Sequence, residues 1–179
     1  MNIPNLITMF RIFLIPIFLL IFHSSLENRV LFSGLIFLLS GISDILDGYI
    51  ARKYDMGTKL GAVLDPFADK LMSFAVLISF AIAELIPYWI IVLILIKELV
   101  MILGGAILYF REDNIVIPSN IYGKAATVLL YASILSIALK FPLNISATLL
   151  ILTVVFNIIA FINYVNIFLG FKNPNNAEL

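Results

Sequence analysis

Six long apolar stretches separated by short polar segments restrict the folds that this chain can adopt. Each stretch has the length of about 20 mostly apolar residues that an α-helix needs to cross a bilayer. Hydrophobic residues make up 63% of the 179 positions, well above the roughly 45–50% of a soluble domain. We therefore predict an all-α integral membrane protein, with one domain over residues 1–179 and a flexible tail at about 171–179. The expected transmembrane helices are approximately Asn5–His23, Arg29–Arg52, Gly61–Glu84, Pro87–Phe110, Ile121–Leu139 and Asn144–Gly170.

Basic residues predict how these six spans are oriented. Cytoplasmic loops of membrane proteins carry an excess of lysine and arginine. Arg29 and Lys140 fall on one side of the membrane, and the other side receives Arg52, Lys53, Lys59, Arg111, Lys124 and Lys172. Both termini should therefore be cytoplasmic. The 11 basic and 11 acidic residues form no polybasic run, so nothing indicates a nucleic-acid partner.

Four carboxylates, Asp44, Asp47, Asp65 and Asp69, lie toward the predicted cytoplasmic ends of the second and third spans. Residues three or four apart share a helix face, so the four converge if those faces meet. Charges at such a depth repel strongly unless cations balance them, and ionisable residues inside the membrane are usually functional. Since the chain has no cysteine, hard oxygen ligands for Mg²⁺, Mn²⁺ or Ca²⁺ are expected. The alternative is a structural ion-pair network with Arg52, Lys53, Lys59 or Lys70.

Glycines accompany the aspartates. Gly34 and Gly48 belong to a seven-residue glycine repeat in the second span, and small residues in membrane helices usually permit close helix packing. Gly48 follows Asp47 directly, and Gly61 lies about one turn before Asp65. The missing side chains at Gly48 and Gly61 would let a phosphate or nucleotide approach the backbone.

The spacing of these residues resembles the signature of the CDP-alcohol phosphotransferase family. The pattern reads Asp44, two residues, Asp47-Gly48, two residues, Ala51-Arg52, eight residues, Gly61, three residues, Asp65, three residues, Asp69. Members of this family are phospholipid-synthesising transferases with six spans, and they are generally homodimers. The resemblance covers the whole pattern of spans.

The resemblance implies a role for each matching position. The four aspartates would hold two divalent ions, Mg²⁺ or Mn²⁺, and Asp69 would also take the proton from the acceptor hydroxyl. The hydroxyl would attack the lipid-linked phosphorus of CDP-diacylglycerol and release CMP, at the cytoplasmic side of the cell (inner) membrane. The pocket for the CDP moiety would be lined by Gly48, Ala51, Arg52 and Gly61.

Two further segments, NIPNLITMFRI and LDPFADKLM, resemble the branch of the family that makes phosphatidylglycerophosphate and uses sn-glycerol 3-phosphate as acceptor. The acceptor phosphate then needs a cationic site. Lys97 and Glu98 lie in the fourth span and point about 100° apart, so we expect them to pair with other helices rather than with each other. A buried structural ion pair is the alternative for Lys97. Candidate phosphate ligands are Arg11, Lys97, Arg111 and Lys124. The alternatives are that Arg111 and Lys124 are positive-inside anchors and that the Arg11 side chain extends to the cytoplasmic surface.

The sequence is also compatible with other functions. Lys97-Glu98 replaces the common Arg-Glu, and Ala126 replaces the second lysine of a Gly-Lys-x-Lys-Thr motif. A cardiolipin synthase that accepts phosphatidylglycerol, or a phosphatidylinositol-phosphate synthase, is therefore possible. A divalent-cation transporter would have midplane sites and often internal repeats, and the sequence shows no repeat. A non-catalytic scaffold would not need all four aspartates.

Overall fold

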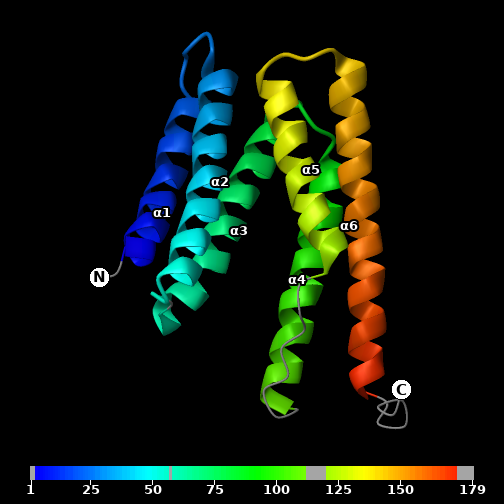
Figure 1. Cartoon of the computed structure of the whole chain (residues 1–179). Coiled ribbons are helices and arrows are strands. Elements are labelled where there is room, and N and C mark those ends of the chain that lie inside the picture. Colours follow the sequence, from blue (N-terminus) through cyan, green and yellow to red (C-terminus); the bar gives the residue numbers. More distant parts are fainter. Residues whose placement is uncertain (1–2, 57, 112–119, 173–179) are drawn as a thin grey trace. The chain divides into compact units, whose positions relative to one another are not determined.

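The computed structural model describes residues 3–56, 58–111 and 120–172, and within these ranges the chain forms six α-helices and no strand (Figure 1). The six predicted spans are confirmed as helices, and their ends agree to within two residues. The expected tail lies outside the described residues beyond Lys172. The helices are α1 (Ile3–Phe22), α2 (Arg29–Lys53), α3 (Lys59–Ile82), α4 (Tyr88–Arg111), α5 (Ile121–Ala138) and α6 (Leu143–Lys172).

Four of these helices are long and apolar enough to cross a membrane: Pro4–Phe22, Arg29–Lys53, Ile121–Ala138 and Leu143–Leu169. Large apolar side chains such as Leu20 and Ile45 are exposed on their surfaces, as expected where lipid rather than water surrounds a helix. The chain is thus a multi-pass membrane protein. That α3 and α4 also span the membrane, and that both termini are cytoplasmic, stay predictions.

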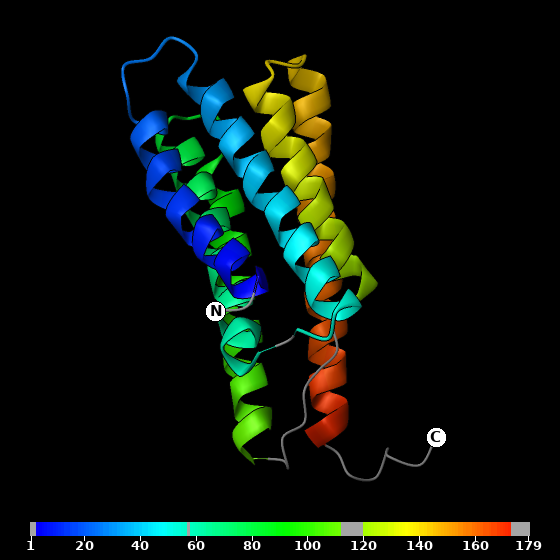
Figure 2. The ribbon, with the colours of Figure 1, turned by 60° about the vertical axis from the view of Figure 1, so that its left-hand side comes forward.

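The helices form two compact units, one of Met1–Ile86 with Ile134–Phe141 and the other of Pro87–Ser133 with Pro142–Leu179. In the first unit, α1 and α2 run in opposite directions (Figure 2). α1 packs extensively against both α2 and α3, whereas α2 and α3 contact each other much less. The Phe22 ring of α1 lies 5.3 Å from the Phe80 ring of α3. The relative placement of α2 and α3 therefore depends mainly on α1.

In the second unit, α4 packs against α6. The Tyr164 hydroxyl of α6 donates a hydrogen bond of 2.8 Å to the Met101 carbonyl of α4. Gly104 makes room for this phenol, because a Cβ at Gly104 would lie 2.7 Å from the Tyr164 hydroxyl oxygen. A Ser133–Thr153 hydroxyl pair, 3.1 Å apart, joins α5 to α6.

Three helices end in the same way without glycine. Asp55, Glu84 and Lys140 follow the ends of α2, α3 and α5 with φ of 51°, 58° and 55°. After α2, the Met56 N–H donates to the Ala51 carbonyl at 3.0 Å. This is the Schellman pattern, which satisfies carbonyls that the helix leaves unpaired. It turns the chain sharply after α2, at the point where α3 must return toward the aspartates.

The packing interpretation of Gly34 is confirmed. A Cβ at Gly34 would lie 2.5 Å from the Ala138 Cβ of α5. Separations this short do not occur between real side chains, so α2 and the end of α5 can approach only because residue 34 has no side chain.

Candidate active site

A polar face of α1 lies against the two aspartate helices. Asn5, Thr8 and Arg11 follow one another at intervals of three residues and are all buried, with 9%, 0% and 1% of their surface exposed. Such spacing places them on one side of a helix. In a helix that is otherwise apolar, three buried polar residues require partners on neighbouring elements.

Arg11 joins the aspartates of α2. Its Nη1 lies 2.6 Å from the Asp44 Oδ1, and its Nη2 donates to the Asp47 Oδ2. The same Nη1 lies 3.5 Å from the Asp65 carbonyl oxygen of α3. The Asp44 side chain is 44% exposed and that of Asp47 only 3%. The arginine therefore neutralises part of the negative charge at the buried end of the cluster and leaves the Asp44 end open.

Thr8 connects α1 to the carboxylate of α3. The Thr8 hydroxyl donates to the Asp65 Oδ1, and its oxygen also lies 3.1 Å from the Pro4 carbonyl. One turn nearer the terminus, the Thr58 hydroxyl donates to the Asn5 Oδ1 at 2.9 Å. The same Thr58 oxygen caps α3 by accepting from the Gly61 N–H at 2.9 Å. α1 therefore holds both the start of α3 and its first aspartate.

Of the four predicted metal ligands, Asp44, Asp47 and Asp65 are gathered around Arg11. Asp69 is half-buried one turn beyond Asp65 on α3. Among the described residues, no group of three His, Cys, Asp or Glu side chains lies close enough to hold one metal ion. That all four carboxylates bind metal ions remains a prediction. Arg11 is a cation that contacts both Asp44 and Asp47, and it is not one of the basic residues predicted for a structural network.

The predicted nucleotide ligands lie on the α2 and α3 ends nearest the connecting turn. Gly48 and Ala51 are half-buried and Arg52 is exposed. A Cβ at Gly48 would lie 3.4 Å from the Arg52 Nη1, so the arginine side chain covers this glycine. Gly61 is buried, and a Cβ there would lie 2.9 Å from the Asn5 Oδ1. Close packing against α1 thus requires Gly61, whatever it binds.

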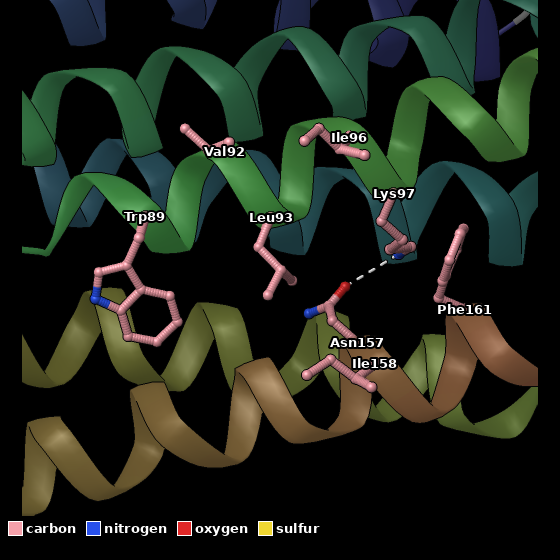
Figure 3. A pocket seen from close by; sticks show the side chains of 8 residues that line it. All are labelled: Trp89, Val92, Leu93, Ile96, Lys97, Asn157, Ile158 and Phe161. Atoms are coloured by element: carbon pink, nitrogen blue, oxygen red, sulfur yellow. Dashed lines mark hydrogen bonds between the residues drawn. The ribbon is translucent and has the colours of Figure 1, made fainter.

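Lys97 belongs to a separate buried cluster. Its Nζ lies 2.7 Å from the Glu98 Oε1 and donates to the Asn157 Oδ1 of α6 at 3.0 Å. The prediction that Lys97 and Glu98 do not pair with each other is wrong, because the long lysine stem lets the amine bend back to its neighbour. Figure 3 shows the amine directed at Asn157 beside an apolar pocket of about 570 Å³. The pocket is lined by Trp89, Val92, Leu93, Ile96, Lys97, Asn157, Ile158 and Phe161.

The other two predicted acceptor ligands flank the polar segment between α4 and α5. Lys124 is exposed in the first turn of α5, which Asn120 caps by accepting from the Gly123 N–H at 2.6 Å. The side chain of Arg111 lies outside the described part of the structure. Lys124 therefore differs from Arg11 and Lys97, whose charged groups are buried in ion pairs.

Thr8 is a site residue that the sequence analysis did not identify. Its signal was present, since Asn5, Thr8 and Arg11 form a polar stripe with a three-residue spacing in an apolar span. The partners of that stripe could not be read from the sequence, because they lie more than 30 residues away.

Comparison with known proteins is consistent with this geometry. The family model described as CDP-alcohol phosphatidyltransferase matches residues 1–159. A protein of Aquifex aeolicus named CDP-diacylglycerol–glycerol-3-phosphate 3-phosphatidyltransferase is 36% identical over 142 residues, covering 78% of this chain and 76% of the relative. A Bacillus subtilis protein with the same name is 34% identical over 138 residues, 70% of each chain. One from Haemophilus influenzae is 47% identical over 77 residues, covering 43% and 42%.

The fold and the site together define a multi-pass helical membrane protein with a partly buried carboxylate cluster. The match over most of its length identifies it further: this chain belongs to the CDP-alcohol phosphatidyltransferase family.

Proposed function

We propose that this protein transfers the phosphatidyl group of CDP-diacylglycerol to sn-glycerol 3-phosphate and so forms phosphatidylglycerophosphate and CMP. The observation that carries this proposal is the gathering of Asp44, Asp47 and Asp65 around Arg11, in a chain that aligns with relatives named for that reaction. A cluster with more negative than positive charge suits the binding of cations and of a pyrophosphate between them.

The donor set fits hard divalent cations, because carboxylate oxygens are the preferred ligands of Mg²⁺ and Mn²⁺. The candidate ligands are the four aspartates, although no three carboxylates among the described residues lie close enough to hold one ion. Two such ions, once bound, would neutralise the pyrophosphate and stabilise CMP as the leaving group.

The chain's own residues account for the other parts of the reaction. Asp69 takes the proton from the acceptor hydroxyl, and its half-buried position on the Asp65 face of α3 supports this role. Gly48 and Ala51 line the nucleotide pocket, and the exposed Arg52 contributes a guanidinium to the CDP phosphates. The bond broken joins the lipid-linked phosphorus to the CMP oxygen, and the acceptor oxygen replaces it.

A lipid donor also agrees with the surroundings of the cluster. An apolar groove of about 600 Å³ lies between α1 and α2, and its lining includes Ser43 and Leu46, which directly precede Asp44 and Asp47. Acyl chains in this groove would keep the diacylglycerol in lipid while its phosphate reaches the aspartates. We propose that this occurs at the cytoplasmic side of the cell (inner) membrane and that the enzyme is a homodimer, both on the strength of the family resemblance.

Binding of the acceptor phosphate is assigned most readily to Lys124. Its side chain is exposed, and the ion pairs between described residues do not include it. Arg111, on the other side of the same polar segment, is the second candidate. The charged groups of Arg11 and Lys97 are already engaged by carboxylates.

An acceptor panel tests the proposal. Purified full-length protein in nanodiscs receives CDP-diacylglycerol and Mg²⁺ or Mn²⁺, with glycerol 3-phosphate, inositol phosphate, serine or phosphatidylglycerol, and CMP release is measured. We expect CMP only with glycerol 3-phosphate. Release only with phosphatidylglycerol or inositol phosphate would replace the acceptor but keep the donor chemistry. Absence of release with every acceptor would overturn the enzymatic proposal.

A further inference from the structure

α1 has the position of a spacer between the two aspartate helices. It packs extensively on α2 and α3, which contact each other little. A site built from Asp44 and Asp47 on one helix and Asp65 on the other therefore depends on α1 for the separation of its two halves. The polar side chains that α1 directs at these halves are Thr8 and Arg11.

Thr8 controls one carboxylate oxygen of α3. The hydroxyl has a single proton, and two acceptors compete for it: the Asp65 Oδ1 and the Pro4 carbonyl at 3.1 Å. A hydrogen bond to an ionised carboxylate is stronger than one to a neutral carbonyl, so the bond to Asp65 is favoured. Thr8 is fully buried, and no bulk water can replace it. The bond therefore orients the Asp65 carboxylate through one of its two oxygens, Oδ1.

Arg11 controls the two carboxylates of α2. Its planar guanidinium binds Asp44 through Nη1 and Asp47 through Nη2, with Nη1 also near the Asp65 carbonyl. A guanidinium has a rigid arrangement of donors that lysine lacks. One rigid group thus sets the distance between Asp44 and Asp47 and ties both to the backbone of α3.

We propose that Thr8 and Arg11 are positioning residues of the metal site, with Thr8 orienting Asp65 and Arg11 holding Asp44 and Asp47 in register with α3. This inference rests on the proposed function. Ligating carboxylates are commonly held by such outer hydrogen bonds, and loss of one typically lowers metal affinity or activity about 10–100-fold. Neither residue needs to contact the substrate for this role.

Thr8→Val tests the first half, because it removes the hydroxyl and keeps the shape. Mn²⁺ binding to the purified full-length protein in nanodiscs is measured from the electron paramagnetic resonance signal of free Mn²⁺. We expect binding about 10–100-fold weaker in Thr8→Val, and close to wild type in Thr8→Ser, which restores the hydroxyl. Thr8→Ala, which is smaller, replaces the valine variant if that variant does not fold.

Thr153→Val is the matched control. Thr153 is also fully buried, donates to a backbone carbonyl of its own helix at 2.8 Å and pairs with the Ser133 hydroxyl. Its loss should lower the thermal unfolding temperature without changing the Mn²⁺ affinity. Wild-type Mn²⁺ affinity in Thr8→Val, or an equal loss of affinity in Thr8→Val and Thr153→Val, would overturn the role of Thr8.

Arg11→Lys tests the second half, because it keeps the charge and loses the rigid pair of donors. We expect weaker Mn²⁺ binding and a lower kcat, with the KM for glycerol 3-phosphate unchanged. A raised KM with unchanged Mn²⁺ affinity would instead make Arg11 an acceptor ligand and overturn its positioning role. If the wild-type protein neither binds Mn²⁺ nor releases CMP, the proposed function itself is contradicted. The variants can be compared only when the wild type shows both properties.

Discussion

The first and second units each bury charged residues among apolar helices, but they neutralise them differently. In the second unit, Lys97 and Glu98 form a pair with opposite charges, both less than one-tenth exposed, and the Asn157 Oδ1 accepts a second hydrogen bond from the amine. In the described part of the first unit, Arg11 faces the carboxylates of both Asp44 and Asp47, and the Asp44 side chain is 44% exposed.

This difference separates a structural cluster from a site that can bind a ligand. A buried pair whose charges cancel gains nothing from a further ion, and replacing such a pair by apolar residues is often harmless. A cluster with excess negative charge and one open side is stabilised by added cations. Burial of charge inside a membrane helix is therefore a weaker indication of function than the balance of charge around it.

The largest expected effect concerns Asp69, the proposed base. Asp69→Asn preserves the shape and removes the ability to accept the hydroxyl proton, so kcat for CMP release should fall about 10²–10⁴-fold. Unchanged elution in size-exclusion chromatography is the control for folding. Turnover close to wild type would remove Asp69 as the base and weaken the contrast between the two clusters.

The second prediction tests whether the Lys97 cluster is only structural. Lys97→Met removes the cation that lies 2.7 Å from the buried Glu98 carboxylate, and the free energy of unfolding should fall by about 3–5 kcal/mol. The double variant Lys97→Met/Glu98→Leu should recover most of that loss and keep the wild-type KM for glycerol 3-phosphate. Thermal unfolding and steady-state kinetics measure the two quantities. A raised KM in the double variant would indicate that Lys97 binds the acceptor phosphate, as predicted from the sequence.

The third prediction concerns Lys124, the exposed candidate for the acceptor phosphate. A charged hydrogen bond is worth about 1.5–3 kcal/mol, so Lys124→Ala should raise the KM for glycerol 3-phosphate roughly 10–100-fold. The unfolding temperature should not change, because the side chain is exposed. If Lys124→Ala has a normal KM, the acceptor site must be sought at Arg111 or elsewhere.

The smallest expected effect concerns two glycines of the first unit: Gly34, which permits close helix packing, and Gly48, which we propose lines the nucleotide pocket. Gly34→Ala forces a Cβ to within 2.5 Å of the Ala138 Cβ, and overpacking of this kind costs about 1–3 kcal/mol of stability. In Gly48→Ala the nearest atom is the Arg52 Nη1 at 3.4 Å, on an exposed side chain that can move. Gly48→Ala should therefore keep its stability and raise the KM for CDP-diacylglycerol. Equal stabilities of the two variants would contradict this distinction.

Most of the fold could be predicted from the sequence, because each helix of a membrane protein satisfies its own backbone and its limits follow from apolar length. Charged and polar residues such as Lys53 and Lys59 mark the helix ends closely. Capping was less predictable, since Asp55, Glu84 and Lys140 adopt positive φ where glycine is usual.

The site could be predicted only in part. The motif on α2 and α3 predicted the aspartates as ligands, since their spacing is local and follows the helix period. Their partners were not identified, because contacts such as Thr8–Asp65 and Arg11–Asp47 depend on how α1 packs, which no local pattern specifies. The pairing of Lys97 with Glu98 could not be predicted for a different reason: the directions in which side chains leave a helix do not limit the reach of a flexible lysine.

The most direct test of the central claim is the dependence of CMP release on both metal and acceptor. Wild-type protein and Asp47→Asn are compared with CDP-diacylglycerol, with and without glycerol 3-phosphate, and with Mg²⁺ or a chelator. We expect equal amounts of CMP and phosphatidylglycerophosphate from the wild type, only when metal and acceptor are both present, and neither product from Asp47→Asn. Product formation in the chelator, or undiminished turnover in Asp47→Asn, would contradict a metal-dependent transfer at the α2 and α3 aspartates.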